Sequence, residues 1–195
     1  MTWRLVALAT LALLVSACST TVRHPAGGTS LEQWEMRGKF SARTRDDSHS
    51  GSWRWLQNAD NNTLSLSGPL GVAATEISSD GHTATIRRGG GHITVSADNT
   101  DALGIDAPLP LPAMRYWLLG QAAPATLYPI AASEREHGSL SALTQAGWSL
   151  HFNRYEAVGT MQLPGLIIAT HGDVRLKLLV KHWDFSVSPD ISPVR

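Results

Sequence analysis

The fold of this chain is decided by the stretch Trp34-Glu35-Met36-Arg37-Gly38-Lys39-Phe40-Ser41-Ala42-Arg43. Its apolar and small residues fall on alternate positions, and charged or polar residues occupy the positions between them. Successive side chains of a strand point to opposite faces, so a period of two predicts a strand with one apolar and one wet face. We therefore expect a sheet that buries one side only.

The same alternation recurs along the chain in short segments that are separated by turn residues. Trp53 and Trp55 share a face of the next segment, and Asp60-Asn61-Asn62 and Gly89-Gly90-Gly91 supply turn chemistry. Short strands at regular spacing predict an antiparallel meander. The predicted strands are residues 34–43, 51–56, 63–67, 72–77, 83–87, 92–96, 139–144, 148–155, 166–170 and 174–183.

Helical signals appear only in the middle of the chain. Residues 100–105 form a weak helical stretch, and residues 113–119 form a stronger one. Pro112 suits a first helical turn, and Gly120 suits the position just after a helix end. The pattern predicts a one-sided sheet, long enough to curl, with two or three helices in mid-chain.

The N-terminus has the features of a secretory signal peptide. Arg4 precedes an apolar run over residues 5–15, about half the length of the roughly 20 residues that span a bilayer. Ser16-Ala17 then leads into Cys18, which is the one cysteine of the chain. This arrangement resembles the bacterial lipobox. It predicts cleavage after residue 17 and lipidation of Cys18.

Lipidation at Cys18 would anchor the mature protein to a membrane. Each buried methylene contributes about 0.8 kcal/mol, so two or more acyl chains hold firmly. Residues 18–30 contain Pro25 and Gly27-Gly28 and predict a flexible tether, which leaves residues 31–195 as the folded domain. Under the sorting rule of Gram-negative lipoproteins, Ser19 favours export to the outer membrane, facing the periplasm.

Composition and motifs argue against several classes of function. The chain has 16 basic and 16 acidic residues, so its net charge predicts no nucleic-acid partner. The eight histidines are scattered without the spacing of a metal site, so we expect no metal. The sequence has no G-x-S-x-G, no H-E-x-x-H and no phosphate-binding loop with a lysine. An enzyme is therefore the weaker hypothesis, and no cofactor is expected.

Ser67-Gly68-Pro69-Leu70-Gly71 places a leucine in a tight glycine- and proline-rich loop. Leu70 could fold back onto the core, as most loop leucines do. It could instead be exposed and mark a contact with a membrane or a partner. The residues alone leave both readings open.

Taken together, these residues resemble the LolB family of outer-membrane lipoprotein receptors. The resemblance covers most of the mature chain and depends on the order and spacing of its motifs together with the lipobox. The motifs are Trp34-Glu35-Met36-Arg37-Gly38-Lys39-Phe40, Trp53-Arg54-Trp55, Gly68-Pro69-Leu70-Gly71, Pro110-Leu111-Pro112, Tyr116-Trp117-Leu118-Leu119-Gly120, Gly147-Trp148 and the strand from Arg175 to Trp183.

This resemblance implies a mainly β (α+β) fold, an incomplete antiparallel β-barrel of about eleven strands with a helical lid over a hydrophobic cavity. It implies a monomer without catalysis or cofactor. The protein would accept lipoproteins from the periplasmic carrier LolA and insert them into the outer membrane. Its partners would be LolA, the acyl chains of client lipoproteins and outer-membrane lipid. Leu70 would assist membrane insertion.

The apolar faces of the strands would then hold the acyl chains of the client. The acyl-cavity candidates are Trp34, Met36, Phe40, Trp53, Trp55, Leu64, Leu66, Trp148, Leu150 and Phe152. Two other hypotheses remain open at this stage. One is a structural or assembly lipoprotein that docks protein partners without binding acyl chains, and the other is a periplasmic lipid-modifying enzyme.

Overall fold

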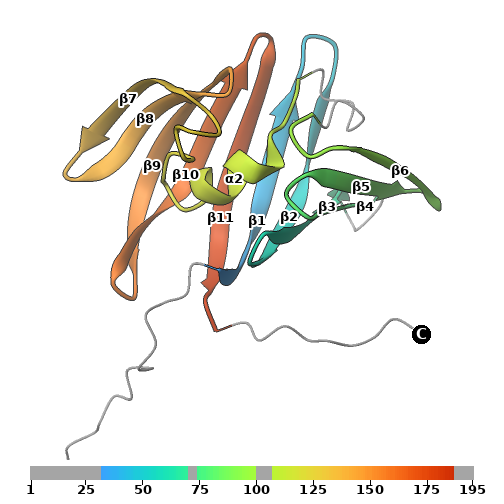
Figure 1. Cartoon of the computed structure of the whole chain (residues 1–195), viewed down its shortest axis with the longest axis horizontal. Coiled ribbons are helices and arrows are strands. Elements are labelled where there is room, and N and C mark those ends of the chain that lie inside the picture. Colours follow the sequence, from blue (N-terminus) through green and yellow to red (C-terminus); the bar gives the residue numbers. More distant parts are fainter. Residues whose placement is uncertain (1–31, 70–73, 100–106, 187–195) are drawn as a thin grey trace, which may run out of the picture. The chain divides into compact units, whose positions relative to one another are not determined.

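A single antiparallel sheet makes up most of the described part of the chain (Figure 1). The computed structural model describes residues 32–69, 74–99 and 107–186. The predicted signal peptide (1–17), the predicted tether (18–30) and the weak helix predicted over 100–105 lie outside these residues. The strands are β1 (Gln33–Arg43), β2 (Ser48–Asn58), β3 (Asn61–Ser67), β4 (Thr75–Ser79), β5 (Thr83–Arg88), β6 (Gly91–Ser96), β7 (Ile130–Glu136), β8 (Ser139–Gln145), β9 (Trp148–Val158), β10 (Met161–His171) and β11 (Val174–Asp184).

The sheet is open. Its strand order is β6-β5-β4-β3-β2-β1-β11-β10-β9-β8-β7, so the first and last strands pair in the middle of the sheet. All other neighbours are consecutive in the chain, as in a meander. Among the described residues, the two end strands β6 and β7 each have one neighbour and do not pair with each other. The structure therefore confirms the incomplete antiparallel barrel of about eleven strands.

Strand β1 has the alternation that the sequence predicts. Trp34 and Met36 are fully buried, whereas Arg37 and Lys39 are exposed. The register with β11 shifts between Arg37, which pairs with His182, and Gly38, which pairs with Val180, so the extra residue Lys181 is on β11. A Cβ atom at Gly38 would lie 1.9 Å from the Leu179 carbonyl oxygen, so only glycine lets the two strands approach there.

The helix α2 (Leu111–Trp117) lies over β10, β11 and β1 and packs into the same apolar core (Figure 1). It begins and ends two residues earlier than the predicted 113–119. Pro112 stands in its first turn, and Gly120 has the positive φ (68°) expected just after a helix. The buried side chains of Leu111, Met114 and Trp117 fix which side of α2 faces the sheet.

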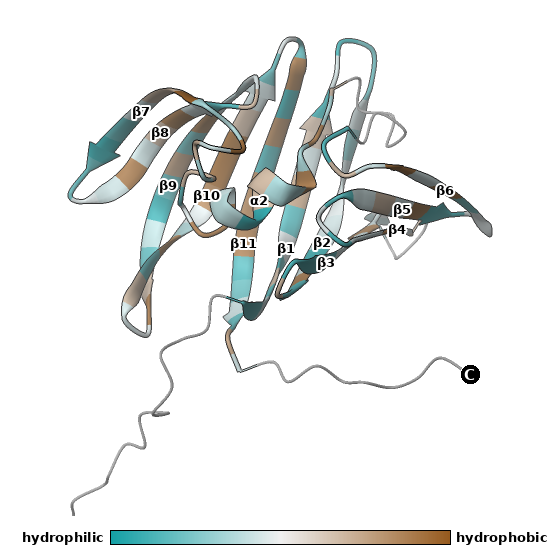
Figure 2. Cartoon of the chain, in the orientation of Figure 1, coloured by the Kyte–Doolittle hydropathy of each residue, from teal (hydrophilic) through white to brown (hydrophobic). Residues whose placement is uncertain are grey.

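The structure also corrects two strand predictions. Strand β7 was not predicted, because all seven of its residues are exposed and no alternation marks a buried face. Strand β10 begins at Met161, five residues before the predicted start. Pro164 and Gly165 obscured this part of β10, although Pro164 pairs with Tyr155 of β9. Bands of high and low hydropathy alternate along β10 and β11 in Figure 2.

Candidate functional site

An apolar cavity of about 630 Å³ lies on the inner side of the sheet, beside helix α2. Its volume falls within the range of about 300–1,000 Å³ typical of small-molecule sites. Strands β1, β2, β3 and β11 supply most of its wall, and Met114 of α2 also borders it. The hydrophobic and small apolar lining residues are Phe40, Ala42, Trp53, Trp55, Leu64, Leu66, Pro69, Leu109, Met114, Leu176 and Leu178.

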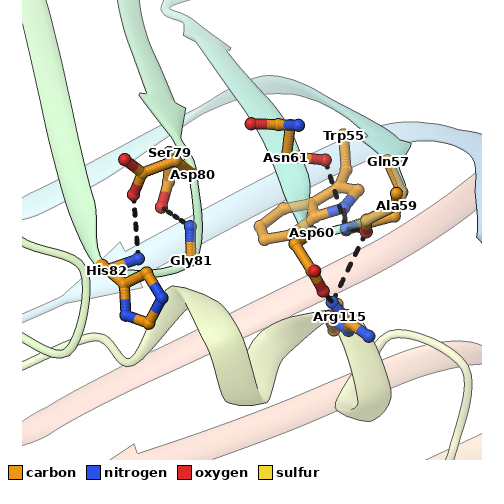
Figure 3. A network of polar contacts seen from close by, with 10 residues as sticks. All are labelled: Trp55, Gln57, Ala59, Asp60, Asn61, Ser79, Asp80, Gly81, His82 and Arg115. Carbon is orange, nitrogen blue, oxygen red and sulfur yellow. Dashed lines mark hydrogen bonds and ion pairs between the residues drawn. The ribbon is translucent and has the colours of Figure 1, made fainter.

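Trp55 is held in this wall by a hydrogen bond and by ring stacking. Its indole Nε1 donates a hydrogen bond to Oε1 of the buried Gln57 at 2.8 Å. Nε2 of Gln57 in turn donates to the carbonyl oxygens of Ala59 at 2.7 Å and Asn61 at 3.2 Å (Figure 3). The Trp55 ring also stacks on Trp34, with centroids 6.3 Å apart and planes 14° apart. These contacts fix the orientation of the indole.

Helix α2 is held against the β2–β3 turn by a polar contact. Nη1 of Arg115 donates to Oδ1 of Asp60 at 2.8 Å and to the carbonyl oxygen of Ala59 at 3.4 Å (Figure 3). The Arg115 guanidinium also lies 4.9 Å from the centre of the Tyr116 ring. Because Met114 adjoins Arg115, this contact positions one of the residues that border the cavity.

One group of cavity residues is polar. It comprises Ser41, Ser48, His49, Ser50, Ser67, Thr75 and Arg88. His49 lies 3.1 Å from the Asp47 carboxylate, and the two side chains are largely exposed. The cavity therefore joins an apolar interior, formed by residues such as Trp55 and Leu64, to a polar and solvent-exposed part.

Five of the ten acyl-cavity candidates line this cavity, namely Phe40, Trp53, Trp55, Leu64 and Leu66. The other five lie in the packed core and do not line it; these are Trp34, Met36, Trp148, Leu150 and Phe152. The reason is physical. A period of two tells which face of the sheet a side chain takes, but it does not tell whether another segment covers that part of the face.

Several lining residues were missing from the sequence prediction. Leu176 and Leu178 of β11 alternate with charged residues, so their pattern could have revealed them. Met114 shares an i, i+3, i+7 apolar stripe with Leu111 and Leu118, which predicts a buried side of the helix but not that this side borders a cavity. Leu109 precedes α2 in a segment without a helix or strand, and no local signal marks it.

Two predicted sites cannot be placed in this cavity. Cys18 and Leu70 both lie outside the described residues, so their roles remain predictions. Pro69, which directly precedes Leu70 in the sequence, does line the cavity. Within residues 32–69, 74–99 and 107–186, no group of three or more His, Cys, Asp or Glu side chains could hold a metal ion. In those same segments no helix combines the length and hydropathy of a membrane span.

The outer face of the same strands carries an ion pair. Arg54 Nη2 donates to Oε2 of Glu35 at 2.6 Å, and Arg37 lies 3.6 Å from the other carboxylate oxygen. Glu35 is buried, and the hydrogen bond from Arg54 holds the pKa of its carboxyl below the usual range, against the opposing effect of desolvation. This pair joins β1 to β2 from outside the cavity.

Comparison with known proteins identifies the family. Residues 32–183 match the family model described as outer membrane lipoprotein LolB. The outer-membrane lipoprotein LolB of Cellvibrio japonicus is 31% identical over 162 residues, which cover 79% of this chain and 78% of that protein. The LolB of Coxiella burnetii strain RSA 493 is 29% identical over 196 residues, which cover 91% of both chains.

A solved structure shares the fold. The LolA superfamily protein NE2245 from Nitrosomonas europaea superposes with a TM-score of 0.56 at 10% sequence identity. The superposition covers 83% of this chain and 89% of that one. At this identity the likeness concerns the fold alone. The family match over residues 32–183 is far more specific, and this chain belongs to the LolB family of outer-membrane lipoproteins.

Proposed function

We propose that this protein accepts lipoproteins from the periplasmic carrier LolA and inserts them into the outer membrane. Membership of the LolB family supports a role in lipoprotein localisation at that membrane. The observation that carries the proposal is the apolar cavity of about 630 Å³ on the inner side of the sheet, beside α2. In this proposal the cavity shelters acyl chains of the client during transfer, and no catalytic step is involved.

The driving force for such a transfer is hydrophobic. Each acyl methylene that leaves water gains about 0.8 kcal/mol, so a chain prefers an apolar cavity strongly to the periplasm. A handover between two cavities placed mouth to mouth never exposes the chains to water. Transfer can therefore run downhill from carrier to receptor to bilayer without nucleotide hydrolysis.

Two further residues complete the proposal. Lipidation of Cys18 would anchor the domain to the periplasmic face of the outer membrane. Leu70 would enter the bilayer when the client is released, and burial of a leucine there contributes about 1.5–3 kcal/mol. That energy orients a tethered domain but is too small to anchor it. The position of Leu70 directly after Pro69, which lines the cavity, supports this role.

The test is a transfer assay with the mature chain carrying Cys18→Ala, purified from the periplasm. Client lipoprotein is supplied on purified LolA, and both acceptance and insertion into outer-membrane vesicles are measured. We expect Leu70→Glu to accept client normally and to fail in insertion, so that loaded protein accumulates. Leu127→Glu is the matched control, because Leu127 is 62% exposed elsewhere in the domain. This control should insert client as the unmodified chain does.

Two results would contradict the proposal. If native mass spectrometry finds no acylated client bound after incubation with loaded LolA, the protein docks partners without binding acyl chains. If Leu70→Glu unfolds the domain by circular dichroism while Leu127→Glu does not, Leu70 is a core residue and not an insertion residue.

A further inference from the structure

Strand β5 ends in a positive charge on the face that its apolar residues occupy. Ala84 and Ile86 on one face of the strand are buried, and the next position on that face is Arg88, the exposed last residue of β5. Arg88 lines the cavity, and it is the one Lys or Arg among the described residues that does so. A charged side chain that borders an otherwise apolar cavity is a candidate for ligand binding.

The Arg88 side chain is held in place by one neighbour. Arg88 lies directly opposite Thr75 in the β4–β5 pair, and its Nε donates a hydrogen bond to Thr75 Oγ1 at 2.9 Å. Thr75 is only 3% exposed, so it provides a fixed support at the cavity wall. The neighbouring Arg87, in contrast, points to the other face and lies 3.5 Å from Glu76.

Most hydrogen-bonding capacity of Arg88 remains free. A guanidinium has five N–H donors, and the bond to Thr75 uses one of them. Within the described part of the chain, the Arg88 side chain makes no ion pair and no other hydrogen bond. Its two terminal nitrogens can therefore bind an oxygen ligand in the geometry that suits carboxylates and phosphates.

The cavity around Arg88 has the polarity of a site for an amphiphile. Trp55 and Leu64 form an apolar interior, whereas His49 and Ser50 are polar residues on the same cavity as Arg88. An acyl chain would occupy the apolar part, and its oxygen-bearing head would reach the guanidinium.

We propose that this cavity binds single-chain anionic lipids and that Arg88 binds their oxyanion head group. The ligand class is an acyl chain that ends in a carboxylate, as in a fatty acid, or in a phosphate, as in a lysophospholipid. The proposal rests on the use of the cavity for acyl chains and adds a class of ligand that is smaller than a lipoprotein. Arg88 favours anionic over neutral head groups, while the apolar wall supplies the affinity for the acyl chain.

The experiment compares an acid with its neutral ester. Palmitate and methyl palmitate each displace a fluorescent apolar probe from the mature Cys18→Ala chain at about pH 8, where the carboxyl group is ionised. We expect palmitate to bind at least about tenfold more tightly, the effect of one good charge-assisted hydrogen bond. In Arg88→Leu this preference should fall to within about twofold, with the affinity of the ester unchanged.

Two further variants control for charge and folding. Arg87→Leu removes the adjacent cation and should leave the preference for the acid intact. Arg88→Lys keeps the charge but not the planar pair of donors, so it should retain part of the preference. If Arg88→Leu loses structure by circular dichroism, Arg88→Gln serves in its place, because glutamine can still bond to Thr75.

A second arm distinguishes the two head groups. Lysophosphatidylglycerol replaces palmitate in the same displacement assay. If Arg88→Leu weakens binding of either lipid, the proposal holds and the weakened lipid identifies the oxyanion. If it weakens neither, or if acid and ester bind alike to the unmodified chain, the proposal is overturned while acyl binding by the cavity stands. If no probe or lipid binds at all, the proposed acyl cavity fails as well.

Discussion

The two halves of the sheet differ in how their inner faces are packed. In the half formed by β1 to β5, the inner face borders an open cavity. In the half formed by β8 to β10, the inner face is packed into the core under α2 and the segment that follows it. Each half contains a buried glutamine that accepts a hydrogen bond from a tryptophan, Gln57 from Trp55 at 2.8 Å and Gln145 from Trp117 at 3.0 Å.

The two glutamines differ in what else they hold. Among the described residues, the Gln57 amide nitrogen donates only within its own β2–β3 turn, to the carbonyl oxygens of Ala59 and Asn61. Gln145 bonds to distant chain, because it accepts from the Ala123 amide at 2.9 Å and donates to the carbonyl oxygens of Ala123 and Tyr128. One buried amide thus ties a covering segment to the sheet, and the other bonds to its own turn.

The largest expected effect is a difference in the free energy of unfolding between two substitutions, one at the packed Trp148 and one at the cavity-lining Phe40. Trp148 of the filled half is fully buried, and its Nε1 donates to the Pro108 carbonyl oxygen at 2.8 Å. Trp148→Ala should lower the free energy of unfolding by about 3–5 kcal/mol, measured by urea denaturation. Phe40→Ala should cost clearly less, because Phe40 is only partly buried and borders space that already exists. Equal losses would mean that the two halves are packed alike.

The next prediction concerns the Gln145 hydrogen bonds that hold the covering segment against the filled half. Gln145→Leu leaves the Trp117 indole and the Ala123 amide and carbonyl groups without their partner in a buried site. We expect a loss of about 3 kcal/mol, because each unsatisfied buried group costs about 1–3 kcal/mol. Hydrogen exchange should increase in the segment around Ala123. If exchange increases equally around Trp55, the tie is not specific to the filled half.

Sequence patterns predicted which face of the sheet a side chain occupies. They did not predict whether that side chain is packed in the core or lines the cavity. Trp34 and Trp55 occupy the same face and stack on each other, yet only Trp55 lines the cavity. The difference depends on which distant segment covers each residue, and no local period contains that information. The roles of Gln57 and Gln145 were missed for a related reason. A polar residue at a strand end looks like a surface residue until the groups around it are known.

A third test concerns the turn that ends α2 and leads into the covering segment. Gly120 has φ 68°, and a Cβ atom there would lie 2.7 Å from the Tyr155 hydroxyl. That hydroxyl donates to the Leu140 carbonyl oxygen at 2.6 Å, and burial raises the pKa of Tyr155 to about 12. Gly120→Ala should therefore cost about 2 kcal/mol in thermal or urea unfolding. Gly138→Ala is the control, because its Cβ would meet nothing within 4 Å at a similar φ of 84°. Both substitutions carry the backbone penalty, so a larger loss at Gly120 measures the contact with Tyr155.

The smallest effect tests whether the Glu35–Arg54 ion pair on the outer face stabilises the half of the sheet that contains the cavity. Glu35 and Arg54 join β1 to β2 on the side away from the cavity, and this hydrogen bond lowers the pKa of Glu35. A carboxyl whose pKa is lower in the folded state stabilises the fold above its unfolded pKa of about 4.3, and this contribution is lost as the pH falls through the folded value. Glu35→Gln should cost about 1 kcal/mol at neutral pH, because Arg54 is half exposed and solvent screens the pair. Below the folded pKa of Glu35, the variant and the unmodified chain should converge in urea unfolding. A difference that is independent of pH would show that the carboxylate acts through packing and not through its charge.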